Sequence, residues 1–219
     1  MNIAEILDPS IPDLKMTTSV GSALDLLDNC KVSCLPVVHN GLFVGMVSEE
    51  NLFEGMPDDK IGGMHTQFSQ PILAPGSSIF DCLKLFGTFE GDLIAVVEDD
   101  FTFHGVVSKN GLVNALSHTN GLQTDGAVIV LDIPVKDYNL TQISSIVEEN
   151  DCKIVALLAN LDMDVNSAQV FLKINSQNIA PILQSLERFD YSVMASFSTD
   201  PYKEDLKLRY EEFLKYLDM

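Results

Sequence analysis

The sequence GMVSEENL at residues 45–52 decides the fold, because the similar sequence GVVSKNGL follows at residues 105–112. The glycine and the first serine recur at the same places, 60 residues later. A repeat of this length indicates a duplicated supersecondary unit whose two copies bury their apolar faces against each other. Two related units that face each other leave a cleft between them, where small ligands often bind. The repeat therefore favours ligand sensing over catalysis.

The stretches upstream of these motifs correspond as well. SVGSALDLL from Ser19 matches SIFDCLKLF from Ser78, and LPVV from Leu35 matches IAVV from Ile94, at an offset of 59. One residue therefore enters the second copy between its two strands. Apolar residues at helical spacing, then two β-branched runs, predict the order helix, strand, strand, helix in each copy.

The first copy contains a strong hairpin signal. Asn40-Gly41 separates the apolar runs 35–39 and 42–47, and this dipeptide is typical of a two-residue turn. Glu49 then begins a short helix. Residues 58–63 are expected to form a linker. The expected elements of the second copy are a helix from Ser78, strands over 93–97 and 104–107 and a helix over 109–116.

A different pattern begins after residue 126. The expected elements, a βαββαβ series, are a strand over 127–133, a helix over 140–149, strands over 153–161 and 169–174, a helix over 179–188 and a strand over 192–197. Such a series predicts a small open sheet with helices on one face. Asp200-Pro201 begins a terminal helix that covers either this sheet or a second subunit. Its apolar stripe consists of Leu206, Tyr210, Phe213, Leu214 and Leu217.

Charge excludes several classes of partner. The 219 residues carry a formal net charge of −19, and Arg188 and Arg209 are the two arginines. Nucleic acid and anionic membrane surfaces would be repelled, since binding them requires a basic face. No apolar run reaches the roughly 18 residues that span a bilayer. The first ten residues lack the features of a secretion signal. We therefore expect a cytoplasmic protein.

The duplicated unit, over about residues 8–117, resembles the cystathionine-β-synthase (CBS) domain, which occurs as a tandem pair called a Bateman module. The G-h-h-S/T-x-x-D end of each copy, where h is an apolar residue, carries the resemblance most specifically. The βαββαβ segment resembles the ACT domain. The whole order is similar to bacterial CBS/ACT proteins of the acetoin-utilisation accessory type. This implies an α+β (α/β) fold with CBS domains at 1–62 and 63–121 and a ferredoxin-like ACT-type domain with the terminal helix at 122–219.

The resemblance implies an adenosine-type nucleotide site in the first cleft. In CBS pairs that bind adenosine nucleotides, the motif hydroxyl faces phosphate and the motif aspartate accepts two hydrogen bonds from ribose. The first copy has an asparagine in place of that aspartate, and its amide oxygen can still accept a hydrogen bond. The implied site residues are Thr17, Val37, Gly45, Ser48 and Asn51.

The second site is degenerate by the same comparison. Gly105 and Ser108 match the motif, but Gly111 stands at the aspartate position and offers no side chain to a ribose. The alternative interpretation of both copies is structural. The serines would then cap the helices that follow them, and the glycines would permit close packing of strands.

The ACT resemblance implies amino-acid binding at the turn after the strand over 127–133. Asp132, Asp137 and Asn139 are the candidate residues, and Asn139 stands near the glycine that amino-acid-binding members often carry. Asparagine tolerates the left-handed conformation better than most residues. The alternative is a domain used for dimer pairing through its sheet.

No sequence motif favours an enzyme or a metal site. The chain has no G-x-S-x-G, P-loop or G-x-G-x-x-G, and its four histidines and four cysteines lack ligand spacing. Cys82 corresponds to Ala23 of the first copy, which favours a small buried role. We therefore predict a non-enzymatic, homodimeric regulatory or sensor protein without cofactor or metal, which responds to a small-molecule effector. The alternative is a ligand-free oligomerisation or protein-interaction module.

Overall fold

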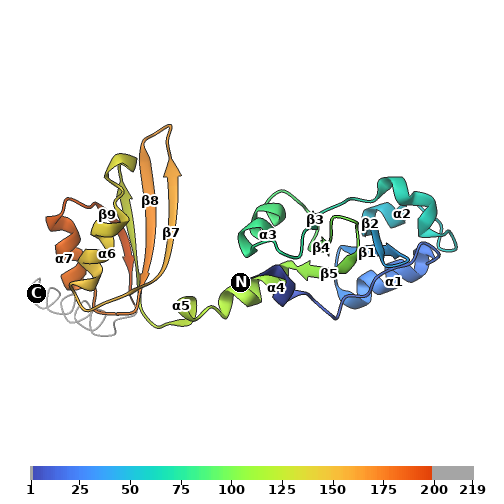
Figure 1. Cartoon of the computed structure of the whole chain (residues 1–219), viewed down its shortest axis with the longest axis horizontal. Helices are drawn as coiled ribbons and strands as arrows, with labels where there is room; N and C mark the ends of the chain where they lie inside the picture. Colours follow the sequence, from blue (N-terminus) through green and yellow to red (C-terminus); the bar gives the residue numbers. More distant parts are fainter. Residues whose placement is uncertain (1, 199–219) are drawn as a thin grey trace, which may run out of the picture. The chain divides into compact units, whose positions relative to one another are not determined.

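The computed structural model describes residues 2–198 and divides into two compact units, residues 1–116 and 117–219. Figure 1 shows their helices and strands, which form an α+β fold as predicted. Each unit is described by itself. The apolar stripe from Leu206 to Leu217 lies outside the described residues.

Unit 1 contains both copies of the repeat in the predicted order. The first copy comprises α1 (Val20–Cys30), β1 (Cys34–His39), β2 (Leu42–Ser48) and α2 (Glu49–Phe53). The second comprises α3 (Ile79–Phe86), β4 (Leu93–Val97), β5 (Phe103–Ser108) and α4 (Lys109–Ser117). Three short elements accompany them: η1 (Ile3–Ile6), η2 (Ile61–Gln67) and β3 (Ile72–Leu73).

Local sequence signals explain where these elements begin. Ser19 Oγ accepts a hydrogen bond from Ser22 N and so caps α1. Ser78 caps α3 in the same way through Asp81 N. Asn40 and Gly41 have φ values of 52° and 83°, the positive pair that a tight hairpin turn requires. The predicted hairpin and the predicted start of a helix at Ser78 are thus confirmed.

The two copies meet through their hairpins in an approximately symmetric way. Phe43 N donates to Phe101 O at 2.8 Å, and Phe103 N donates to Gly41 O at 3.0 Å. Because residues 41 and 43 correspond to residues 101 and 103, exchanging the copies turns one bond into the other. The rings of Phe43 and Phe103 stack between them, 6.1 Å apart. The expected face-to-face docking of the copies is confirmed.

Short segments cross between the copies and complete their cores. Ile3 is fully buried and packs with Ile79 and Cys82 of the second copy. Asp8 N donates to Val106 O at 2.8 Å. Ser69 N likewise donates to Met46 O of the first copy at 3.1 Å, and Met46 corresponds to Val106. The domain boundary after residue 62 stays a prediction, and the two cores draw on residues from both sides of it.

The expectation of a linker over residues 58–63 was wrong. Ile61 is fully buried in the first core, and its N–H donates to Thr18 O at 3.0 Å. The polar and glycine residues around Ile61 indicate a loop, but this single apolar side chain anchors the segment. The predicted burial of Cys82, by contrast, is confirmed.

Unit 2 has the predicted βαββαβ series. Its elements are β6 (Ala127–Ile133), α6 (Leu140–Glu148), β7 (Ile154–Asp162), β8 (Ser167–Ile174), α7 (Ala180–Arg188) and β9 (Val193–Phe197), with short turns α5 (Asn120–Gln123) and η3 (Val135–Asp137). The strands lie in the order β7-β8-β6-β9 with antiparallel neighbours, which is the ferredoxin-like arrangement.

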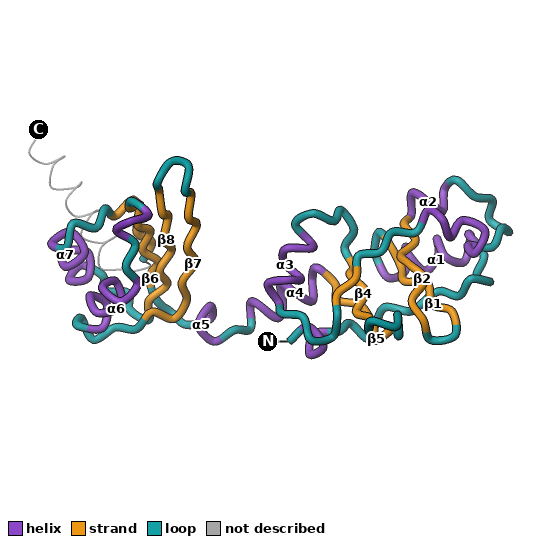
Figure 2. The backbone as a smooth tube through the Cα atoms, turned by 45° about the horizontal axis from the view of Figure 1, so that its top comes forward, coloured by secondary structure: helices purple, strands orange, loops and turns teal. Residues whose placement is uncertain are grey.

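Both long helices of unit 2 cover one face of this sheet, as Figures 1 and 2 show. Ile143 of α6 and Ile182 of α7 pack against Val170 and Leu172 of β8, and all four are fully buried. The strict alternation of buried and half-buried residues along β8 follows from this one-sided cover. The opposite face therefore retains exposed apolar side chains. Leu158, Met194 and Phe197 are each more than 60% exposed, at 66%, 62% and 63%.

Candidate ligand clefts

The first cleft of unit 1 is a cavity of about 420 Å³ beside the first motif. It is bounded by the junction of β2 and α2, by the end of η2 and by the loop between α3 and β4. Both copies of the repeat therefore contribute to it. Its lining residues are Ser33, Cys34, Ser48, Glu49, Glu50, Asn51, Gln67, Ser69, Phe89, Glu90 and Gly91.

Two of the predicted residues meet in this cleft as a capping box. Ser48 Oγ donates to Asn51 Oδ1 at 2.9 Å and accepts from Asn51 N at 3.2 Å. Asn51 Oδ1 also accepts from Ser48 N at 3.2 Å. The two side chains thus bind each other and begin α2, which is the structural role of the alternative interpretation. A ligand hydroxyl at Asn51 would compete with these bonds.

The other three predicted residues do not line the first cleft. Thr17 is exposed in the turn before α1, and Val37 is fully buried in the core. Gly45 lies at the bulge where β2 shifts register against β1. A Cβ there would stand 2.6 Å from Phe68 Cβ, so the glycine permits the close approach of that segment.

The charged groups of the first cleft are carboxylates. Glu49, Glu50 and Glu90 line it, and none of the described lining residues is Lys or Arg. Burial, followed by the nearby Asp92 carboxylate, raises the pKa of Cys34 to about 11, so its thiol stays neutral at physiological pH. An ammonium or sulfonium group would be favoured in this cleft, whereas a phosphate would be repelled.

An aromatic wall completes the first cleft. Phe89 is half-buried, and its ring lies where a side chain at residue 91 would be, in contact with the position of a Cβ on Gly91. The absence of a side chain at Gly91 thus makes room for the ring. The sequence motif did not reveal Phe89. The Phe-x-Gly spacing could have suggested it only if the loop had been known to reach the first motif.

The second cleft is the counterpart of the first and measures about 510 Å³. Ten of its eleven lining residues stand 59 or 60 positions from a residue that lines the first cleft, as Ser108 does from Ser48 and Asp92 from Ser33. Its lining residues are Asp8, Ser10, Ile11, Cys30, Lys31, Val32, Asp92, Leu93, Ser108, Lys109 and Asn110. The duplicated sequence has therefore produced a pair of related clefts.

The motif serine of the second cleft is engaged by a carboxylate. Ser108 Oγ donates to Asp8 Oδ2 at 3.1 Å and accepts from Gly111 N at 3.0 Å. A Cβ at residue 111 would lie 3.0 Å from that same oxygen. Gly105 has more room than Gly45, since its nearest neighbour would be Leu7 Cδ1 at 3.5 Å. Ser108 therefore caps α4 and is not presented to a phosphate.

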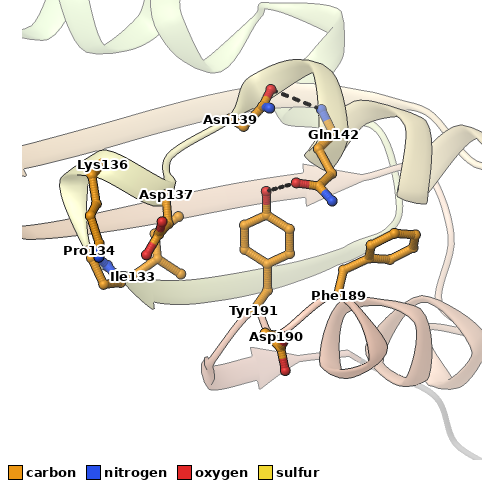
Figure 3. Close-up of a pocket in the computed structure, with 9 residues that line it drawn as sticks. All are labelled: Ile133, Pro134, Lys136, Asp137, Asn139, Gln142, Phe189, Asp190 and Tyr191. Atoms are coloured by element: carbon orange, nitrogen blue, oxygen red, sulfur yellow. Dashed lines mark hydrogen bonds between the residues drawn. The ribbon is translucent and has the colours of Figure 1, made fainter.

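Unit 2 has a polar cavity of about 500 Å³ at the turn after β6, shown in Figure 3. The Tyr191 ring faces this turn, and its hydroxyl donates to Gln142 Oε1 at 3.0 Å. Burial raises the pKa of Tyr191, and the Asp137 carboxylate adds to the effect. The lining residues are Ile133, Pro134, Lys136, Asp137, Asn139, Gln142, Phe189, Asp190 and Tyr191.

The structure brings together two of the three candidates at this turn. Asp137 and Asn139 line the cavity, whereas Asp132 accepts a hydrogen bond from Ser167 Oγ at 2.8 Å and does not line it. Asn139 has φ −126° and caps α6 through Gln142 N. The left-handed conformation considered for Asn139 is therefore wrong, because the asparagine serves as an extended N-cap.

Within residues 2–198, no three His, Cys, Asp or Glu side chains are grouped as a metal ion would require. None of the helices in that range combines the length and apolar character needed to cross a bilayer.

Comparison with known proteins identifies the first copy. The CBS domain family matches residues 3–58. No curated protein matches the chain. A CBS domain pair/ACT domain protein of Thermotoga maritima has a similar structure at 21% identity and a TM-score of 0.47, covering 53% of this chain and 96% of that one.

Two further solved structures are similar to about half of this chain. The CBS domains of a transcriptional regulator from Streptococcus pneumoniae are 20% identical, with a TM-score of 0.47 over 52% of this chain and 98% of that one. CBSX2 in complex with AMP is 23% identical, with a TM-score of 0.46 over 52% and 95%. The ACT-type assignment of unit 2 stays a prediction. Residues 3–58 match the CBS domain family, and the second copy of the repeat follows them with the same order of helices and strands.

Proposed function

We propose that this chain is a non-catalytic regulatory protein whose tandem CBS pair binds an adenosine-type ligand in the first cleft. The observation that carries the proposal is the Phe89 ring at the wall of that cleft, beside the polar Ser48 and Asn51. An aromatic ring of this kind can stack on a purine. Neighbouring serine and asparagine side chains can exchange hydrogen bonds with a ribose.

The charge of the first cleft narrows the class of ligand. Three glutamates without a lysine or arginine in the lining favour an adenosine compound that is neutral or positively charged. Adenosine and S-adenosylmethionine meet this condition. AMP, ADP, ATP and NAD carry phosphate charge that these carboxylates would repel, most strongly for ATP.

Binding would act on the relation between the two copies. Phe89 and Glu90 belong to the second copy, and Ser48 and Asn51 to the first, so a bound ligand would contact both. A ligand shifts a conformational equilibrium only by its unequal affinity for the two states. A ligand that bridges the copies favours the closed arrangement and so alters any surface that depends on it.

A thermal-shift panel tests the proposal. A ligand at 100 times its dissociation constant stabilises the protein by roughly 2.7 kcal/mol. We expect adenosine or S-adenosylmethionine to raise the melting temperature more than ATP does. Phe89→Ala should abolish the shift. Phe53→Ala is the matched control, since Phe53 is exposed on α2 and does not line the cleft. No shift with any compound at millimolar concentration would overturn the proposal.

A second candidate function is a homodimeric interaction module. It is favoured by the open face of the sheet in unit 2, where Leu158, Met194 and Phe197 are largely exposed. Covering such a face with a second copy would remove apolar area from water. Light scattering should then give a dimer mass that Leu158→Asp reduces to that of a monomer. A dimer that persists in this variant would exclude this face.

A third candidate is amino-acid binding at the turn of unit 2. Lys136 and Asp137 line the cavity there and carry the opposite charges that a zwitterion requires. A panel of amino acids in the same melting assay tests this, with Tyr191→Phe as a local variant that keeps the ring. A cytoplasmic location remains part of the proposal.

A further inference from the structure

The two clefts of unit 1 differ in charge at equivalent positions. Glu49 of the first cleft corresponds to Lys109 of the second, and Glu90 corresponds to Lys31. At a third position Glu50 corresponds to the uncharged Asn110. The first cleft thus contains three carboxylates, whereas the second contains two lysines and two aspartates. In a chain with a net charge of −19, a cleft with balanced charge is a distinct local environment.

The two aspartates of the second cleft are already occupied by hydrogen-bond donors. Asp8 Oδ1 accepts from Ser10 N at 3.1 Å and Ser10 Oγ at 2.6 Å, while its other oxygen accepts from Ser108. Asp92 accepts from Ser33 N at 3.0 Å and from Ser33 Oγ at 2.9 Å. Both carboxylates therefore have their partners within the protein.

The two lysines have no such partner. Across residues 2–198, the ion pairs are His104 with Glu98 and Lys153 with Glu148, so neither Lys31 nor Lys109 is paired with a carboxylate. Lys109 lines the cleft, and its Nζ lies 5.5 Å from the centre of the Phe86 ring, which does not line it. Lys31 follows α1 and is exposed. Its flexible stem lets the ammonium reach a ligand in the cleft.

We propose that the second cleft binds a small anionic metabolite, with one carboxylate or phosphate group held by Lys31 and Lys109. The cleft of about 510 Å³ has the size of small-molecule sites. Gly111 supplies no side chain at the ribose-binding position of the motif, so the ligand need not be a nucleoside. The second copy is then a site of different specificity. This inference does not depend on the adenosine-type ligand of the first cleft.

Calorimetric titration of the full chain at low ionic strength tests the inference, with inorganic phosphate and citrate as separate probes. The two probes distinguish a phosphate site from a carboxylate site. We expect saturable binding of one probe with one site per chain. The double variant Lys31→Glu, Lys109→Glu gives the second cleft the charges of the first and should weaken binding at least tenfold. Melting curves verify that this variant is folded.

A matched control separates a site from general attraction. Lys15→Glu with Lys84→Glu makes the same change in net charge on unit 1, outside both clefts. Its affinity should stay within twofold of the wild type. The reciprocal variant Glu49→Lys, Glu90→Lys should add a second anion site. The inference would be overturned if neither phosphate nor citrate bound saturably. It would also be overturned if the control variant lost as much affinity as the Lys31→Glu, Lys109→Glu variant. Neither result would bear on adenosine binding in the first cleft, which the thermal-shift panel tests separately.

Discussion

Ser33 and Asp92 hold equivalent positions in the two copies of the repeat, 59 residues apart, and they are hydrogen-bonded to each other. Ser33 lines the first cleft and Asp92 lines the second. After the duplication, this position became a serine in the first copy, which donates hydrogen bonds, and an aspartate in the second copy, which accepts them. The pair joins the two copies at a point where a residue of the first cleft is bonded to a residue of the second.

Removing this pair should weaken the joint between the copies. Asp92→Ala leaves Ser33 without its acceptor, and loss of charged hydrogen bonds costs about 1–3 kcal/mol. Hydrogen-exchange mass spectrometry on peptides from β1 and β4 should show faster exchange, while β6 and β8 remain unchanged. This method is needed because all five tyrosines lie beyond residue 137, so tyrosine fluorescence reports unit 2. Asp99→Ala, in the exposed hairpin loop, is the control and should have no effect.

The motif glycines should differ in their tolerance of alanine. Both lie at equivalent bulges, but a Cβ at Gly45 would meet Phe68 Cβ at 2.6 Å, whereas one at Gly105 would meet Leu7 at 3.5 Å. Crowding in a packed region costs roughly 1–3 kcal/mol. The melting temperature of unit 1, measured by calorimetry, should therefore fall further for Gly45→Ala than for Gly105→Ala. Equal destabilisation would show that backbone conformation, and not crowding, determines the preference for glycine.

The thiols of Cys34 and Cys82 should react slowly. Burial raises the pKa of each to about 11, with the Asp92 carboxylate contributing for Cys34. At pH 8 only about one thiolate in a thousand would form at such a pKa, and the thiolate is the reactive species. Titration with a disulfide reagent should show two slow thiols, assigned by mass spectrometry. Asp92→Asn should speed the reaction of Cys34 and leave that of Cys82 unchanged.

Acid should remove the contribution of the Asp8 carboxylate to the stability of the folded protein. Hydrogen bonds from Ser10 hold the pKa of Asp8 below 3.8, despite the opposing effect of burial. A lowered folded-state pKa gives stability that is present above pH 3.8 and is lost as the pH falls through the folded value. The difference in unfolding free energy between the wild type and Asp8→Asn should therefore be constant near neutral pH. It should become smaller as the pH falls below 3.8.

The carboxyl titration of Asp8, followed by carbon-13 NMR, measures the cause directly. Ser10→Ala should raise the pKa of Asp8 toward 3.8, because it removes the strongest hydrogen bond. Ser144→Ala, on α6 of unit 2, should leave it unchanged. An Asp8 that titrates at 3.8 or higher in the wild type would contradict this account.

The secondary structure could be predicted because each element has a local signal. Asn40-Gly41, the Ser19 and Ser78 caps and the alternation along β8 depend on neighbouring residues only, and all are observed. The burial of Ile61 could not be found in this way, since its polar and glycine neighbours suggest a loop.

The clefts were harder to predict because contacts between distant segments form them. Phe89, Glu90 and Asp8 line clefts whose motif serines lie about 40 to 100 residues away in sequence. Without knowledge of the docked copies, no pattern connects these segments. Family resemblance pointed to Ser48 and Asn51, which do line the first cleft. It also pointed to Val37, which the core buries because a strand residue facing inward cannot face a ligand.

The packing of Ile3 and Asp8 on the second copy has a consequence for the order of synthesis. These residues are synthesised before the partners they require, such as Ile79, Val106 and Ser108, which follow some 75 to 100 residues later. The segment over residues 3–8 therefore lacks these partners until the second copy has been synthesised. Closure of the second copy depends on contacts of long sequence separation, so we expect it to be slower than the folding of the first copy.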